Sequence, residues 1–146
     1  MTSVNDRVVV STDLPLSYVL LHAARAMEAR VESALSQYGL SMAKLGILRH
    51  LVLEGAPLTL TRLAELNSCV KSNITQLVDR LEADKLVERI GDPDDRRSVR
   101  AAITEAGIDA CANGNAEVGA VERELVSFLG RPEYERLREA LFRLKS

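Results

Sequence analysis

Apolar side chains recur every three or four positions along most of this chain, the spacing that puts them on one face of an α-helix. The first such run predicts a long helix over residues 16–38, with Gly39 as its stop signal. A second run predicts a helix over residues 42–54, for which Ser41 can accept a hydrogen bond from the first free N–H groups. The chain therefore opens on two helices separated by a tight break.

Two further helices follow in quick succession. Thr59 can cap a short helix, and residues 67–68 supply the turn into the next one. The apolar positions of that next helix form an i, i+3, i+4, i+7 stripe, made of Ile74, Leu77, Val78 and Leu81. We expect this stripe to be buried. The polar residues on or beside the opposite face are Lys71, Ser72, Asn73, Gln76, Asp79 and Arg80.

After this helix the spacing of apolar residues changes from about 3.6 positions toward 2, which indicates strands. Residues 86–90 predict one strand and residues 99–103 a weaker one, joined by the turn-rich segment 91–98. Thr104 can cap a second long helix, and a last helix follows residues 130–132. In the second long helix we expect the following residues to face inward: Ile108, Ala112, Val118, Val121, Leu125 and Phe128. The last helix carries Tyr134, Leu137, Leu141 and Leu144.

Composition is consistent with one helical domain. Hydrophobic residues make up 47% of the 146 residues, but aromatic residues only 3%, so small aliphatic side chains must fill the core. Glycines at 107, 114 and 119 each weaken the second long helix by about 1 kcal/mol relative to Ala, so we expect it to need support from a partner subunit.

Two Cys and two His in no zinc-like spacing predict neither metal nor cofactor. Without a membrane-spanning or signal-peptide pattern, we expect no membrane contact and a cytoplasmic location.

A short helix, a tight turn, a second helix and a β-hairpin, in that order, describe a winged helix-turn-helix. The predicted fold class is therefore mainly α with a small β-hairpin (α+β), and the second helix is expected to enter the DNA major groove. There Asn73 and Gln76 can pair with adenine, and Arg80 can reach guanine or phosphate. The residues that can position the DNA backbone are Lys71, Ser72 and Thr75.

Arginines cluster in and just after the second half of the hairpin loop, in a chain whose formal net charge is -2. Arg96, Arg97 and Arg100 lie close together in sequence, and an arginine at a hairpin tip can enter a narrow minor groove. Asp95 can orient one of them through a charge-assisted hydrogen bond. Because the whole chain is slightly acidic, DNA affinity must come from this local patch and should depend strongly on salt.

Four segments together resemble the MarR family of bacterial regulators: NITQLVDRLE at 73–82, LVER at 86–89, DRR at 95–97 and ITEAG at 103–107. The resemblance implies a tail over residues 1–13 and a single domain over 14–146, with dimerisation helices in 14–40 and 104–146. It places the winged helix-turn-helix in 41–103 and its wing in 86–103. It further implies a homodimer, a pseudo-palindromic operator in double-stranded DNA and, often, a small ligand or oxidant that alters affinity. By the same resemblance, Arg97 is the minor-groove arginine and Asp95 its partner.

The chain departs from the family pattern at three places. Val70 stands where a capping Ser or Asp is frequent, so the start of the helix would depend on Ser68 or Asn73. Lys85 replaces a frequent Gly, so that junction either strains a left-handed residue or closes differently. Residues 101–103 form a weaker strand than usual, so we expect a hairpin that is mobile until it meets DNA.

Candidates for sensing a signal are few. His22 and His50 lie on the helices that, in such proteins, border a pocket between the dimerisation and DNA-binding parts, and Arg25 is one turn beyond His22. They are candidates for ligand contact, with a structural role as the alternative. Cys69 can sense oxidants if the start of the helix or Lys71 stabilises its thiolate, and a buried inert thiol is the alternative. For Cys111 we expect an inert thiol.

Among function classes, the sequence favours a homodimeric repressor that blocks promoter access. It lacks a Gly-rich phosphate loop, a nucleophile elbow and a metal motif, so we do not expect an enzyme. The alternative is a helical protein-interaction module without specific DNA binding, because dimer faces and partner faces look alike in sequence. The arginine-bearing hairpin separates the two, since an interaction module has no need for it. The operator, the regulated genes and the effector remain open.

Overall fold

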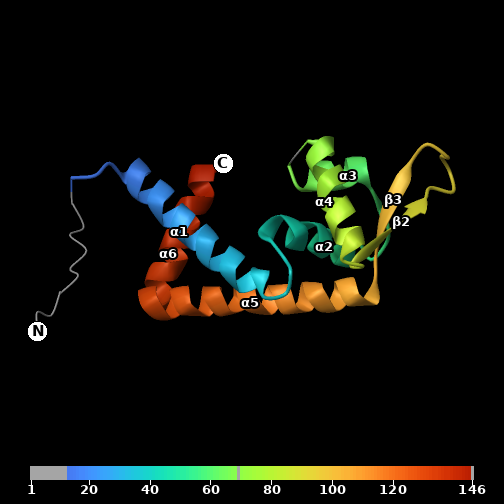
Figure 1. Cartoon of the computed structure of the whole chain (residues 1–146). Helices are drawn as coiled ribbons and strands as arrows, with labels where there is room; N and C mark the ends of the chain where they lie inside the picture. The colour runs from blue at the N-terminus through green and yellow to red at the C-terminus, as the bar shows by residue number, and fades with distance from the viewer. Residues whose placement is uncertain (1–12, 69, 146) are drawn as a thin grey trace, which may run out of the picture.

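The computed structural model describes residues 13–68 and 70–145. The elements in chain order are α1 (Leu16–Ser36), α2 (Met42–Glu54), β1 (Leu58–Thr59), α3 (Leu60–Leu66), α4 (Lys71–Ala83), β2 (Val87–Gly91), β3 (Val99–Ile103), α5 (Glu105–Leu129) and α6 (Arg131–Lys145). Figure 1 shows an elongated molecule, with α1 and α6 at one end, α3, α4 and the strands at the other, and α5 running beneath both. The predicted order of helices and hairpin is confirmed.

The three predicted helix caps are confirmed. The hydroxyl oxygens of Ser41, Thr59 and Thr104 each accept a hydrogen bond from the backbone N–H three residues later, at 3.1, 3.1 and 3.0 Å. Each such cap stabilises its helix by about 1 kcal/mol. The predicted stop signal Gly39 is also confirmed, because it adopts the left-handed conformation with φ of 67°, and Gly55 after α2 does the same with φ of 64°. Local sequence signals therefore fix these boundaries.

The two ends of α4 depart from ordinary helix chemistry. Val70 is the N-cap and offers no side-chain acceptor, and the prediction that Ser68 or Asn73 replaces it is wrong: neither side chain caps the helix. Ser68 lies in the preceding turn with φ of 50°, and Asn73 already belongs to the helix with its side chain exposed. At the other end Lys85 has φ of 60°, so the first of the two alternatives for this junction, a strained left-handed residue, is confirmed.

The strands form one antiparallel sheet in the order β1-β3-β2. β2 and β3 pair along their whole length, from Val87 opposite Ile103 to Gly91 opposite Val99. The sequence did not predict β1, because two residues are too short to show a period. β1 places Thr59 opposite Arg100, and so ties the start of α3 to β3 close to the hairpin loop.

The core lies where α2 and α4 meet the end of α1 and the base of the sheet. Leu35 of α1, Ile47 and Leu48 of α2, and Ile74 and Val78 of α4 are fully buried. In the predicted stripe of α4, Leu81 is likewise buried and Leu77 is half-buried, which confirms that face. Each buried aliphatic side chain contributes roughly 1.5–3 kcal/mol, so α4 is held by its apolar face and leaves its polar face free.

α5 is only partly buried within one chain. Val121 is buried and Val118 and Leu125 are half-buried, as predicted. The prediction is wrong for the other three positions: Ile108 is 48% exposed, Phe128 is 85% exposed and Ala112 is exposed. The reason is that α1 and α2 cover only one side of α5.

The glycines of α5 allow the chain to approach itself closely. A Cβ atom at Gly107 would lie 2.1 Å from the carbonyl oxygen of Leu86, and one at Gly114 would lie 2.8 Å from a methyl carbon of Leu45. At 107 and 114, packing within the same chain therefore takes up the space that a side chain would fill. The expected support of the whole helix by a partner subunit stays a prediction.

Candidate nucleic-acid interface

α4 lies at the end of the molecule that carries the hairpin (Figure 1), and its polar face is exposed to solvent. Its candidate DNA contacts Lys71, Ser72, Asn73, Gln76 and Arg80 are all exposed. Thr75 differs, because it is half-buried and its hydroxyl donates a 3.0 Å hydrogen bond to the carbonyl oxygen of Lys71. The hydroxyl of Thr75 is thus partly used within the helix.

An ion-pair cluster joins α4 to β2. The guanidinium of Arg89 contacts the carboxylates of Asp79 and Glu82, and the backbone N–H of Arg89 donates to Glu82 Oε1 at 3.3 Å. Burial lowers the pKa of Arg89, but the hydrogen bonds from Asp79 and Glu82 outweigh it and raise that pKa above its ordinary value. Asp79 is therefore a structural partner of the hairpin rather than part of a DNA-reading face.

Sequence reasoning missed Arg89, although a signal was present. Side chains of a strand alternate between faces, so Arg89 shares a face with the buried Val87 two residues earlier. A cation on the inward face of a strand is costly to bury unless an acidic side chain pairs with it, and the end of α4 supplies such side chains. A second missed contact is Lys44, whose ammonium donates to Asp84 at 2.9 Å and to the carbonyl oxygen of Gly39 at 3.1 Å. It ties the end of α4 to the start of α2.

The loop between β2 and β3 presents Arg96 and Arg97, both exposed. Asp95 does contact Arg97, as expected, but its carboxylate accepts a 2.9 Å hydrogen bond from the backbone N–H rather than from the guanidinium. Ser98 N–H donates to the carbonyl oxygen of Asp95 at 3.0 Å and closes the turn. Asp95 thus shapes the loop and leaves the side chain of Arg97 outside that contact.

Arg100 lies apart from the other two arginines. It is half-buried in β3 and its guanidinium donates to Asp92 at 3.2 Å, whose side chain is only 8% exposed. The backbone N–H of Asp94 and the guanidinium of Arg100 together hold the pKa of Asp92 below its ordinary value. Within the protein, Arg100 acts as a support for the loop.

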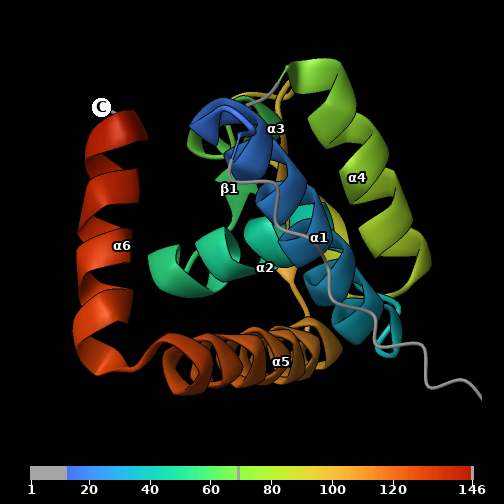
Figure 2. The ribbon, with the colours of Figure 1, turned by 90° about the vertical axis from the view of Figure 1, so that its left-hand side faces the viewer.

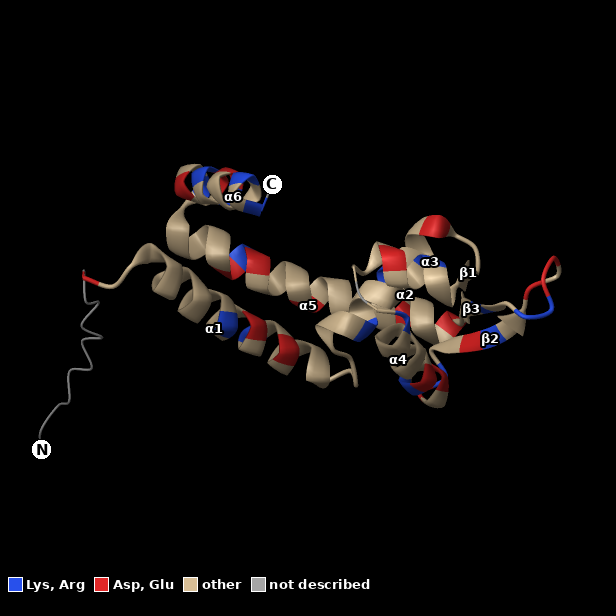
Figure 3. Cartoon of the chain, turned by 90° about the horizontal axis from the view of Figure 1, so that it is seen from above, with Lys and Arg blue, Asp and Glu red and all other residues tan. Residues whose placement is uncertain are grey.

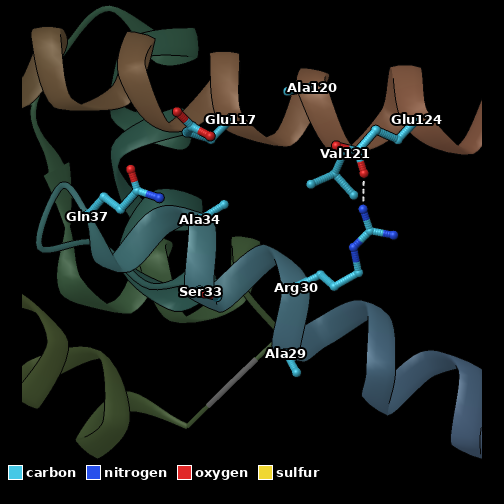
Figure 4. A pocket seen from close by; sticks show the side chains of 9 residues that line it. All are labelled: Ala29, Arg30, Ser33, Ala34, Gln37, Glu117, Ala120, Val121 and Glu124. Atoms are coloured by element: carbon cyan, nitrogen blue, oxygen red, sulfur yellow. Dashed lines mark hydrogen bonds and ion pairs between the residues drawn. The ribbon is translucent and has the colours of Figure 1, made fainter. Parts of the chain in front are cut away.

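The three ligand candidates are not brought together around a cavity. His22 and Arg25 are exposed on α1, and His50 is half-buried on α2. A cavity of about 470 Å³ lies instead between α1 and α5, crossed by the ion pair of Arg30 with Glu124 (Figure 4). A second cavity, of about 290 Å³, lies between α2, β3 and α5. None of the three candidates lines either cavity.

Of the two cysteines, the structure describes only Cys111. Cys69 lies outside the described residues. Cys111 is buried in α5, and its sulfur accepts a 3.6 Å hydrogen bond from the side-chain amide of Asn115. Burial raises the pKa of the Cys111 thiol and shields the sulfur from solvent, in agreement with the expected inert thiol.

No helix in residues 13–68 and 70–145 has the length and apolar character needed to cross a membrane. In the same ranges, no three or more His, Cys, Asp or Glu side chains gather in a way that would hold a metal ion.

The arrangement of α3, α4 and the sheet, with a polar helix face beside an arginine-bearing hairpin, defines a winged helix-turn-helix protein. A model of the MarR family matches residues 38–98. The HTH-type transcriptional regulator MhqR of Bacillus subtilis (strain 168) is 30% identical over 131 residues, 90% of this chain and 90% of that one. The chain therefore belongs to the MarR family of transcriptional regulators.

Solved structures agree with this assignment. A probable transcriptional regulator from Pseudomonas aeruginosa is 27% identical, with 90% of this chain and 98% of that chain covered and a TM-score of 0.78. A mutant MarR from E. coli, complexed with operator DNA, shares the fold at 24% identity, with 90% and 94% covered and a TM-score of 0.77. The predicted family and fold class are confirmed.

Proposed function

We propose that this protein is a homodimeric repressor that binds a pseudo-palindromic site in double-stranded DNA. α4 would lie in the major groove, with Asn73, Gln76 and Arg80 facing base edges. The β2–β3 loop, with Arg96 and Arg97, would lie at the neighbouring minor groove. A mutant MarR from E. coli, whose fold this chain shares, is complexed with operator DNA, which supports DNA as the ligand proposed here.

The distribution of paired and unpaired cations carries this proposal. Around the helix-turn-helix, the arginines that pack against the protein are paired: Arg89 with Asp79 and Glu82, and Arg100 with Asp92. By contrast, Lys71, Arg80, Arg96 and Arg97 form no ion pair with any described residue. Figure 3 shows basic residues next to acidic ones at the outer end of the hairpin. A protein with a formal net charge of -2 that leaves these cations unpaired has a local patch suited to phosphate and base edges.

Exposed apolar residues at the opposite end support a homodimer. Leu16 and Leu21 of α1 are 71% and 58% exposed, and Leu144 of α6 is 71% exposed. α6 stands away from the helix-turn-helix and meets mainly the end of α5 (Figure 2). Soluble monomers rarely expose large contiguous apolar patches, so we expect a second copy of the chain to bury these residues. A two-fold axis there would place two copies of α4 about one DNA turn apart.

A small molecule is the proposed regulator, and the cavity between α2, β3 and α5 is its best-supported site. The cavity is lined mainly by apolar residues, among them Leu51, Val52, Ile103 and Ile108. A ligand there would contact both a strand of the hairpin and the long helix, so it could change the spacing of the two DNA-binding ends. A Val52→Trp variant, which fills the cavity, should keep its DNA affinity but should no longer be released by any compound that releases the wild type.

The primary test is a gel shift of the wild type and Arg97→Ala on DNA from the region upstream of its own gene, over a salt series. We expect specific binding by the wild type, weaker binding by the variant, and a steep fall in affinity with salt. No specific shift by the wild type at low salt, combined with recovery of a bound protein partner, would favour the alternative of a protein-interaction module. An isotherm insensitive to salt would likewise contradict the proposal.

A further inference from the structure

A small cavity lies where three parts of the DNA-binding end meet. It measures about 160 Å³ and is lined by Thr59 and Thr61 at the start of α3, Lys71 at the start of α4, and Arg97 and Ser98 at the end of the hairpin loop. The pairing of β1 with β3 brings these segments together, because it fixes Thr59 opposite Arg100, two residues after Ser98. The position of the cavity thus follows from the strand that sequence reasoning missed.

The chemistry of the lining suits an anion. Two cations and three hydroxyl-bearing residues surround the space, and no carboxylate lines it. Neither Lys71 nor Arg97 forms an ion pair with a described residue, whereas nearby Arg62 is paired with Glu65 at 3.2 Å. The charge of the two cations at the cavity is therefore available to a ligand.

The hydroxyl groups add directional donors. Thr59 Oγ1 already accepts the backbone N–H of Arg62, which leaves its own O–H free to donate. The hydroxyls of Thr61 and Ser98 form no hydrogen bond with the described residues. Together with the ammonium of Lys71, they provide donors from three separate elements around one small space.

We propose that this cavity is a seat for one phosphodiester group of the DNA backbone, and the proposal rests on the function proposed above. When α4 occupies a major groove and the hairpin reaches the adjacent minor groove, a single backbone strand passes between them. The seat lies between these two elements, with Lys71 on the major-groove side and Arg97 on the minor-groove side. A phosphate held there would fix α3, α4 and the hairpin in one register along the DNA.

The test uses the full-length protein and an operator duplex located by footprinting the upstream DNA. Each phosphate of a half-site is replaced in turn by an uncharged methylphosphonate. We expect one position per half-site at which the wild type loses about tenfold in affinity, as for a charged phosphate contact. On the duplex that carries the methylphosphonate at that position, Lys71→Ala and Ser98→Ala should bind as tightly as the wild type, because the contact is already lost. On duplexes substituted at any other position, both variants should bind more weakly than the wild type.

Further variants separate charge from hydrogen bonding. Lys71→Ala should also reduce the slope of log affinity against log salt by about 1, whereas Thr61→Val should weaken binding without changing that slope. Arg123→Ala, which removes an exposed cation on α5, is the matched control and should follow the wild type at every position. The single seat is overturned if the methylphosphonate that no longer weakens binding lies at a different phosphate for Lys71→Ala than for Ser98→Ala. It is also overturned if every methylphosphonate weakens the two variants as much as it weakens the wild type.

Two other outcomes are distinguishable. Failure of the wild type to bind any duplex defeats the proposed function itself, rather than the seat alone. Saturable binding of inorganic phosphate in the absence of DNA, lost in Lys71→Ala, would assign the cavity to a free anion and overturn its assignment to the DNA backbone.

Discussion

Arg89 of β2 holds Asp79 of α4, and with the same guanidinium it also holds Glu82 one turn further along that helix. The hairpin and the helix proposed to read DNA are therefore joined by side chains as well as by the chain between them. In the proposed DNA complex both elements fit adjacent grooves at once, so this contact would hold them at a fixed angle to each other.

Replacing Arg89 by Ala should weaken this joint. The Arg89 side chain is 25% exposed and its partners are more so, so solvent screening limits the effect to about 1 kcal/mol of unfolding free energy, measured by urea denaturation. DNA affinity should fall further than stability explains, because the hairpin loses its fixed angle. Arg62→Ala, which breaks the exposed pair with Glu65, is the control and should change stability by less than about 0.5 kcal/mol. Equal effects of the two variants would contradict this role for Arg89.

Lys85 occupies a conformation that glycine adopts without cost. Its φ of 60° places it in the left-handed region, which disfavours a side chain by roughly 1–2 kcal/mol. Lys85→Gly should therefore raise the unfolding free energy by about 1 kcal/mol, despite the greater freedom of glycine in the unfolded chain. Lys85→Ala keeps the Cβ atom and should leave stability nearly unchanged. A loss of stability in the glycine variant would show that the side chain of Lys85 makes a compensating contact.

Where a feature depends on local chemistry, the sequence predicted it well. The caps at Ser41, Thr59 and Thr104 follow from the preference of helix starts for hydroxyl acceptors, and the buried stripe of α4 follows from its period. The polar face of that helix follows directly, since the opposite face is buried. These are relationships within a few residues or one helix turn.

Features that depend on distant segments were not predicted. β1 exists only because β3 lies beside it, and the seat at Lys71 requires three segments to converge. The exposure of Phe128 could not be foreseen either, since Phe128 continues the helical spacing of the apolar residues that were expected to be buried in α5. The ion pair of Arg100 with Asp92 depends on how the loop folds, which a run of charged residues does not specify.

Two glycines of α5 should respond oppositely to the same substitution. Gly107→Ala places a Cβ 2.1 Å from a backbone oxygen of Leu86, which cannot move without shifting β2, so we expect a loss of about 3 kcal/mol or more. Gly119→Ala meets only the flexible end of Arg123, at 3.5 Å, and should gain up to about 1 kcal/mol from better helix propensity. Thermal unfolding of both variants checks this. A similar change in both would mean that helix propensity alone governs these positions.

Acid should weaken the hairpin through Asp92. The folded state holds the pKa of Asp92 below its ordinary value, so the unfolded state takes up a proton first as pH falls. The stabilisation from this group is therefore fully present above an unfolded pKa of about 4 and is lost as pH drops through the lower, folded pKa. Asp92→Asn removes the titrating group, so it should be less stable than wild type near pH 7, and the difference should shrink below about pH 4. Urea unfolding across that pH range measures it, with Asp94→Asn as the neighbouring control. A gap between wild type and Asp92→Asn that does not change with pH would show that Asp92 stabilises the loop without its charge.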